Sequence, residues 1–133
     1  MNEVESELNS LSERIIGCCY TISNTLGSGF LEKVYQNALA HELRKLGLKV
    51  EIQKPLHVIY DQVIVGEYFA DLLIEDVLII ELKACDGFND AHKAQCINYL
   101  NSTRLPLCLL INFGRPKVEI KRIFQSKFLE NIA

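Results

Sequence analysis

Three ionisable residues lie close together in the most apolar part of the sequence. Glu81 and Lys83 follow the hydrophobic run at residues 77–80, and Asp71 precedes them in a stretch of similar character. Side chains alternate between the two faces of a β-strand, so we expect Glu81 and Lys83 on one face and Leu82 on the other. Charges in such a setting are costly unless they pair with each other or bind something. The pattern therefore marks Asp71, Glu81 and Lys83 as candidates for a functional site.

Two carboxylates and an ammonium group are the set that phosphodiester hydrolysis requires. Carboxylates and a main-chain carbonyl can hold Mg²⁺, which prefers oxygen ligands and keeps several waters. A bound metal lowers the pKa of water and screens the charge of the phosphate. A lysine can orient that water or stabilise the developing negative charge. The same side chains could instead form a buried ion pair without a function, so the three residues alone leave both interpretations open.

Helical periodicity and glycine stops define the first part of the chain. A first helix is predicted from about Val4 to Leu26, and Gly27-Ser28-Gly29 ends it. A second helix is predicted from about Leu31 to Leu46, directly before Gly47.

Alternating apolar and β-branched residues then predict a sheet. In chain order we expect strands at residues 50–59, 63–74 and 77–84, a helix at 91–101, strands at 105–112 and 118–124, and a short terminal helix. Pro55 predicts that the first strand lies at an edge or contains a bulge. The order ααβββαββα predicts an α/β fold in which helices flank a mixed β-sheet.

Length and composition indicate a single globular domain. The 133 residues fit one domain, which we divide into an N-terminal helix (1–26), a core (27–124) and a short C-terminal helix (125–133). The contents of 49% hydrophobic and 23% charged residues are ordinary for such a domain. The acidic N-terminus and the lack of an apolar run of about 18 residues argue against a signal peptide and a membrane span. A cytoplasmic location is therefore expected.

Positive charge is concentrated in the second half of the chain. Residues 1–82 hold six Lys and Arg against thirteen Asp and Glu, and residues 83–133 hold eight against four. A nucleic-acid-binding surface should therefore use cations of the second half, unless these form an ordinary solvated surface. The candidates are Lys93, Arg104, Arg115, Lys117, Lys121 and Arg122. The net charge of −3 favours a homo-oligomer or a partner protein that supplies part of the grip on the substrate.

The five cysteines do not predict a disulfide framework or a zinc site. Their number is odd, Cys18 and Cys19 are adjacent, and no CxxC pair occurs. Cys85, His92 and Cys96 have the only spacing that resembles a metal site, and buried thiols with an incidental histidine are the favoured interpretation.

Two further motifs connect these observations to a known family. Residues 29–35 read G-x-x-E-x-x-Y, and residues 95–99 read Q-x-x-x-Y. From about Ile15 to Phe124 the chain resembles the GxxExxY family, which is grouped with the PD-(D/E)xK nuclease superfamily. The second motif is similar to that of the RecB-like and lambda-exonuclease-like branch. The resemblance implies a restriction-endonuclease-like core.

The resemblance also implies a role for each matched residue. Asp71 and Glu81 would be the principal metal ligands, together with the carbonyl of Leu82 and an acidic residue, Glu32, from the preceding helix. Lys83 would act on the attacking water. The remaining matches are a residue that hydrogen-bonds into the site, Gln95, and supporting residues, Gly29, Tyr35 and Tyr99. Ala70 departs from the pattern, because the superfamily's name has proline there.

These observations lead to three hypotheses. The favoured one is a nuclease that uses Mg²⁺ or Mn²⁺ to hydrolyse phosphodiester bonds in nucleic acid, with DNA as the expected substrate. The alternative is a non-catalytic nucleic-acid-binding or accessory module that retains the nuclease fold. A structural dimerisation domain, with Glu81 and Lys83 as a buried ion pair, is the third.

The catalytic hypothesis sets a condition on the hairpin before Glu81. A two-residue turn at Glu75-Asp76 would pair Asp71 with Ile80 and place Asp71 on the face opposite Glu81. An odd-length loop or a one-residue bulge is therefore predicted, with Glu32 facing the same point. Because the three carboxylates repel one another, a divalent cation should stabilise the folded protein, and Asp71→Asn should stabilise the metal-free form.

Overall fold

The computed structural model describes residues 2–127, and its elements follow the predicted order as far as the last strand. The helices and strands are α1 (Glu3–Leu26), α2 (Glu32–Lys45), β1 (Val50–Tyr60), β2 (Val63–Ile74), β3 (Leu78–Lys83), α3 (Asp90–Thr103), β4 (Leu107–Asn112) and β5 (Glu119–Phe124). Most of the predicted terminal helix at 125–133 lies outside the described residues.

The five strands form one mixed sheet in the order β1-β2-β3-β4-β5. β3 and β4 pair in parallel, and the other neighbouring strands pair antiparallel. The parallel pair requires a crossover, which α3 provides. β1 lies at an edge of the sheet, as Pro55 predicted.

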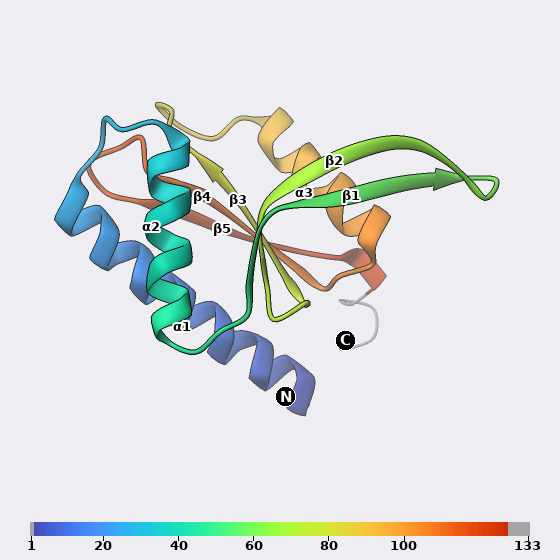
Figure 1. The fold of residues 1–133 in the computed structure, drawn as a ribbon, viewed down its shortest axis with the longest axis horizontal. Coiled ribbons are helices and arrows are strands. Elements are labelled where there is room, and N and C mark those ends of the chain that lie inside the picture. The colour runs from blue at the N-terminus through green and yellow to red at the C-terminus, as the bar shows by residue number, and fades with distance from the viewer. Residues whose placement is uncertain (1, 128–133) are drawn as a thin grey trace.

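Helices cover both faces of the sheet (Figure 1). The larger core lies between the sheet and the pair α1 and α2, and it contains Ile80 and Leu82. The smaller core lies between the sheet and α3, and it contains Ile79. The alternation predicted for β3 is therefore present, and it directs Glu81 and Lys83 toward the face that α3 covers.

The turn between β2 and β3 has an odd length, as the catalytic hypothesis required. Ile74 pairs with Leu78, so three residues, 75–77, connect the strands. Glu75 and Asp76 adopt left-handed backbone conformations, with φ of 51° and 60°. The last ladder pair is Leu72 with Ile80, and the next step along both strands brings Asp71 opposite Glu81. Both carboxylates consequently belong to the same side of the sheet.

The outer halves of β1 and β2 form a two-stranded arm, residues 55–69, which extends away from the body of the protein (Figure 1). Apolar side chains are exposed near its tip, including Tyr60 at 74% and Val65 at 58%. No lysine or arginine occurs between Lys54 and Lys83, so the arm has no cation.

Candidate active site

Glu81 and Lys83 lie at the end of the buried strand β3. Glu81 is 4% exposed, and its Oε2 lies 3.7 Å from Nζ of Lys83. Its other oxygen, Oε1, is buried and has no hydrogen-bond partner within the described residues. A buried carboxylate oxygen without a donor is costly, so this atom is positioned for a ligand or a proton.

Asp71 faces Glu81 and has both carboxylate oxygens engaged. Its Oδ2 accepts a hydrogen bond of 2.7 Å from the backbone N–H of Leu82, and its Oδ1 accepts one of 3.0 Å from Nε2 of Gln53. These two donors hold the carboxylate in one orientation.

The two carboxylates of the site cannot both ionise easily without a cation. Burial and, after it, the negative charge of Asp71 raise the pKa of Glu81 to about 9, against the opposing effect of Lys83. Glu81 therefore holds a proton at neutral pH when no cation is bound.

Residues of the Q-x-x-x-Y segment contact Lys83 from α3. Oε1 of Gln95 lies 3.4 Å from Nζ of Lys83. Nε2 of Gln95 donates a hydrogen bond of 2.8 Å to the hydroxyl of Tyr99, which in turn lies 3.4 Å from the carbonyl of Phe69. Burial and the charges of Glu81 and Asp71 raise the pKa of Tyr99, so its hydroxyl stays protonated. Tyr99 thus positions Gln95, and Gln95 restrains the ammonium group.

The G-x-x-E-x-x-Y segment shapes the start of α2. Gly29 has a φ of 112°, a conformation that favours glycine. The hydroxyl of Tyr35 donates a hydrogen bond of 2.6 Å to the carbonyl of Gly27 and accepts one of 3.2 Å from the N–H of Phe30. The ring of Tyr35 stacks on Phe113 with 4.6 Å between centroids. Gly29 and Tyr35 therefore fix the loop before α2, which sets the position of Glu32.

Glu32, the first residue of α2, remains exposed and does not join the other carboxylates. Within residues 2–127, no group of three His, Cys, Asp or Glu side chains could hold a metal ion. Glu32 lies on the site side of α2, because its charge acts on His92 and because Gln36, one turn further on, points to the site. The structure thus unites Asp71, Glu81 and Lys83, and leaves Glu32 nearby.

Two glutamines of the site were missed in the sequence. Oε1 of the buried Gln36 accepts a hydrogen bond of 2.6 Å from Nε2 of Gln53, the same group that donates to Asp71. Gln53 lies between the pairs Ile52–Leu72 and Lys54–Ala70, and its φ of 52° is left-handed. No local pattern in the sequence indicated that Gln53 would turn toward Asp71.

The end of β3 is held by the end of β4. The N–H of Phe113 donates a hydrogen bond of 2.9 Å to the carbonyl of Lys83. Asn112 is fully buried, and its amide bonds both the N–H and the carbonyl of Cys85, at 3.0 and 2.9 Å. A Cβ on Gly114 would overlap the backbone of Cys85, so the two segments are in close contact. These contacts fix the backbone that carries Lys83.

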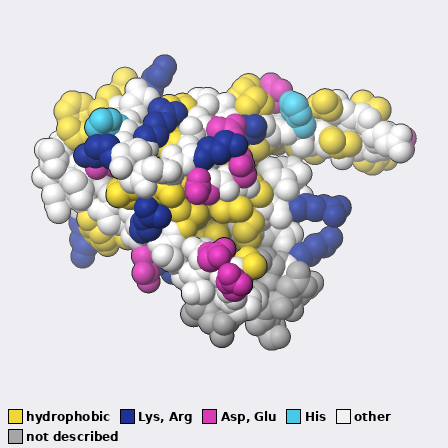
Figure 2. Space-filling view, turned by 60° about the horizontal axis from the view of Figure 1, so that its bottom comes forward, with side chains coloured by type: hydrophobic (Ala, Val, Ile, Leu, Met, Phe, Trp, Pro, Cys, Tyr) yellow, Lys and Arg dark blue, Asp and Glu magenta, His cyan; other side chains and the backbone are white. Residues whose placement is uncertain are grey.

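The candidate nucleic-acid-binding cations do not form one surface. Lys121 pairs with Leu110, on the α3 face, and the next residue, Arg122, points to the opposite face. Arg115 lies at the site end, where its guanidinium donates a hydrogen bond of 3.2 Å to the carbonyl of Asp86, and Arg104 lies at the other end of α3. Lys and Arg side chains are accordingly scattered over the face in Figure 2.

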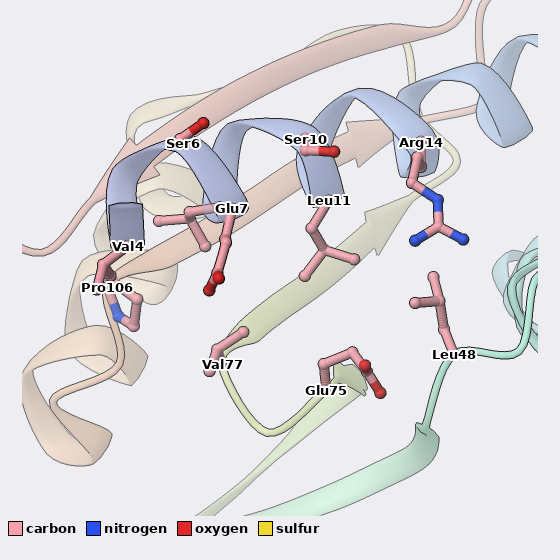
Figure 3. A pocket seen from close by; sticks show the side chains of 11 residues that line it. Val4, Ser6, Glu7, Ser10, Leu11, Arg14, Leu48, Glu75, Val77 and Pro106 are labelled. Carbon is pink, nitrogen blue, oxygen red and sulfur yellow. The ribbon is translucent and has the colours of Figure 1, made fainter. Parts of the chain in front are cut away.

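Two other features do not add to the site. Cys85, His92 and Cys96 do not form a metal site: His92 caps α3 through Asn89, and the buried Cys96 hydrogen-bonds with Cys108. The hollow in Figure 3 lies at the opposite end of β3, between the start of α1 and the turn before β3.

Comparison with known proteins identifies the class and then the family. A mixed five-stranded sheet with helices on both faces, and an acidic pair beside a lysine at the end of β3, agrees with a nuclease fold of the α/β class. The chain belongs to the PD-(D/E)XK nuclease superfamily, whose family model matches residues 9–123. The superfamily assignment is confirmed, and membership of the GxxExxY family remains a prediction.

Two solved structures share the fold. An alkaline exonuclease (LHK-Exo) from Laribacter hongkongensis has a TM-score of 0.55 and 15% identity, over 99% of this chain and 76% of that one. A crystal structure of SSO0001 has a TM-score of 0.52 and 16% identity, over 74% of this chain and 55% of that one. No curated protein matches the chain. Among the described residues, no helix has the length and apolar character needed to cross a membrane.

Proposed function

We propose that this protein is a metal-dependent nuclease that hydrolyses phosphodiester bonds in nucleic acid, with DNA as its substrate. The observation that carries the proposal is the meeting of Asp71, Glu81 and Lys83 at the end of β3, where the buried Oε1 of Glu81 has no hydrogen-bond partner among the described residues. Membership of the PD-(D/E)XK nuclease superfamily supports the reaction class.

The donor set fits a hard divalent cation such as Mg²⁺ or Mn²⁺. The unpartnered Oε1 of Glu81 lies beside the carboxylate of Asp71, and carboxylate oxygens are the ligands that these ions prefer. The carbonyl of Leu82 and the carboxylate of Glu32 would be the further ligands. The chemistry that the cation supplies in such a site is a more acidic water and neutralisation of phosphate charge.

The residues of the chain prepare this site for hydrolysis. Gln53 and the N–H of Leu82 keep the carboxylate of Asp71 oriented. Glu81 would have to be ionised to serve as a ligand. Lys83, restrained by Gln95, presents its ammonium group to the attacking water and to the charge that develops on the phosphate.

Cleavage assays on single- and double-stranded DNA and RNA, with Mg²⁺, Mn²⁺ or EDTA, test the proposal. Lys83→Ala should lower the rate about a hundredfold or more, as expected for loss of a group that stabilises developing charge. Asp71→Ala should abolish metal-dependent cleavage. Lys45→Ala is the matched control, because Lys45 is exposed and its one ion pair within residues 2–127 is with Glu42, on α2. Equal rates for wild type and Lys83→Ala would contradict the proposal.

The position of Glu32 favours one alternative, a nucleic-acid-binding or accessory module that retains the fold without turnover. An exposed Glu32 leaves the site with two carboxylates in contact rather than three. This alternative predicts nucleic-acid binding without cleavage in either metal. A homo-oligomer or a partner protein would supply further contacts to the substrate in both cases.

A further inference from the structure

A trough runs along α3 from the candidate active site toward Arg104. It consists of two adjoining hollows, both lined by Tyr68 of the arm and Asn98 of α3. The first hollow is also lined by Gln95, whose Oε1 lies 3.4 Å from Nζ of Lys83. The second is also lined by Arg104. From Gln95 to Arg104 the helix rises by about 13 Å, so the trough is long enough for more than one nucleotide.

The hollow nearest the site suits a flat, uncharged group. None of the described residues that line it is Asp, Glu, Lys or Arg. His92 lies at its edge, and burial together with the positive charge of Lys83 lowers the pKa of His92, which keeps the imidazole neutral. Tyr68 is 43% exposed, and its ring packs against that of Tyr99 with 5.7 Å between centroids. Asn98 offers an amide that has no hydrogen-bond partner within the described residues.

These features match a nucleobase in an unpaired strand. An aromatic ring can stack on any base, and an amide can bond its edge as both donor and acceptor. A base within a duplex is covered on both faces by its neighbours and cannot lie on Tyr68. Arg104 at the far end forms no ion pair within residues 2–127, and its charge is available to a phosphate of the same strand.

We propose that the trough between the arm and α3 binds a single-stranded segment of nucleic acid, with one base against Tyr68 and a backbone phosphate at Arg104. The inference rests on the proposed nuclease function for the direction of the strand, which leads from the scissile phosphate at Lys83 into the trough. It narrows the substrate class to single strands, or to duplexes with an unpaired end. The residues that line the trough do not distinguish a ribose from a deoxyribose strand.

Binding is measured separately from cleavage, by fluorescence anisotropy with labelled short oligothymidylate, oligouridylate and a blunt duplex in Ca²⁺. Tyr68→Ala should weaken single-strand binding about tenfold, a typical effect of losing one stacked base. Tyr68→Phe should bind like wild type, because it keeps the ring. Tyr60→Ala is the control, since Tyr60 is exposed on the same arm and lies outside the trough.

Arg104→Ala should reduce the dependence of single-strand binding on salt by about one phosphate contact, a change of about 0.7 in the logarithmic slope. Arg122→Ala, on another face, should leave the slope unchanged. Melting temperatures of all variants confirm that they fold. Comparing the affinities for oligothymidylate and oligouridylate shows which of the two strands is preferred. A preference for either one supports single-strand binding in the trough.

The outcomes separate this inference from the proposed function. Single-strand binding that depends on Tyr68, in a protein that cleaves nothing, would support the trough and remove the nuclease proposal. Metal-dependent cleavage, together with equal single-strand affinities of wild type and Tyr68→Ala, would overturn the proposal that the trough binds a single strand. It would leave the nuclease proposal in place. Wild-type binding to the blunt duplex alone, or to none of the three probes, would also overturn the proposal that the trough binds a single strand.

Discussion

At the scale of single residues, the proton on Glu81 is the feature with the clearest consequence. The pKa of Glu81 rises from 4.5 to about 9 in the folded, metal-free protein. The stabilisation that this raised pKa provides is complete below pH 4.5 and is lost as the pH rises through 9, because the unfolded chain releases the proton first. Glu81→Gln removes this dependence. Melts in EDTA from pH 5 to 9 should show a smaller decline for Glu81→Gln than for wild type.

Hydrogen bonds explain why the neutral substitution should be made at Glu81 and not at Asp71. Both oxygens of Asp71 accept hydrogen bonds, so Asp71→Asn would set an N–H against the N–H of Leu82 or of Gln53. Repulsion between the carboxylates alone predicts that Asp71→Asn stabilises the metal-free protein. Because that substitution also disrupts a hydrogen bond, we expect the stabilisation from Glu81→Gln instead. Parallel melting curves for wild type and Glu81→Gln would contradict the protonated Glu81.

Metal binding and the same proton should be linked. A divalent cation requires the ionised form of Glu81, so bound metal must displace the proton. The rise in melting temperature caused by millimolar Mn²⁺ should consequently be larger at pH 8.5 than at pH 6. Glu81→Gln should lose this response, whereas Glu42→Gln, at a partly exposed carboxylate paired with Lys45 on α2, should keep it. Identical melts with EDTA, Mg²⁺ and Mn²⁺ would remove the case for a metal-dependent enzyme.

Gln53 should act as a positioning residue for Asp71. Gln53→Gly accommodates the φ of 52° and deletes the side chain whose amide bonds Asp71 and Gln36. Loss of a hydrogen bond to a charged group should weaken Mn²⁺ affinity and activity by about tenfold, at a nearly unchanged melting temperature. Titration of activity against Mn²⁺ measures this effect, and Gln53→Asn, which tolerates the backbone but is shorter, should be intermediate. An unchanged Mn²⁺ titration would assign Gln53 a purely structural role.

At the scale of elements, the sequence could predict which side chains of the site share one face of the sheet. Alternation along β3 joined Glu81 to Lys83, and the need to bring Asp71 to the same face required an odd turn, which the structure contains. The two missed glutamines depend on contacts over 17 and 18 residues of sequence. Such contacts follow from the left-handed backbone at Gln53 and the docking of α2, which periodicity does not specify.

The close approach of Gly114 to Cys85 yields a prediction about the end of β3. A Cβ at position 114 would overlap the backbone of Cys85, two residues after Lys83, and the overlap can be relieved only by moving one strand end. Gly114→Ala should therefore lower the free energy of unfolding by about 1–3 kcal/mol and displace Lys83. Gly87→Ala is the control, because its Cβ would meet only the end of the Arg115 side chain. Denaturant melts of both variants decide the point.

At the scale of the whole molecule, charge determines which face the nucleic acid can use. The arm and the strands up to Glu81 carry no cation after Lys54, so phosphates have no partner there. The cations that accompany the site are Lys83 itself, Arg115 beside Asp86 and Lys93 in the first turn of α3. Figure 2 shows the contrast between the arm, without dark blue side chains on its outer part, and the body. The substrate should therefore approach over the start of α3.

The dependence of binding on salt tests this approach. Lys93→Ala should weaken binding of every nucleic acid uniformly and reduce the logarithmic salt slope by about 0.7–0.9, the effect of one lost phosphate contact. Arg122→Ala removes the same charge from the opposite face of the sheet and should change neither quantity. Lys93 is a cleaner probe than Arg115, whose guanidinium also bonds the loop after β3. Equal slopes for wild type and Lys93→Ala, with a reduced slope for Arg122→Ala, would place the nucleic acid on the face that α1 and α2 cover, away from Lys83.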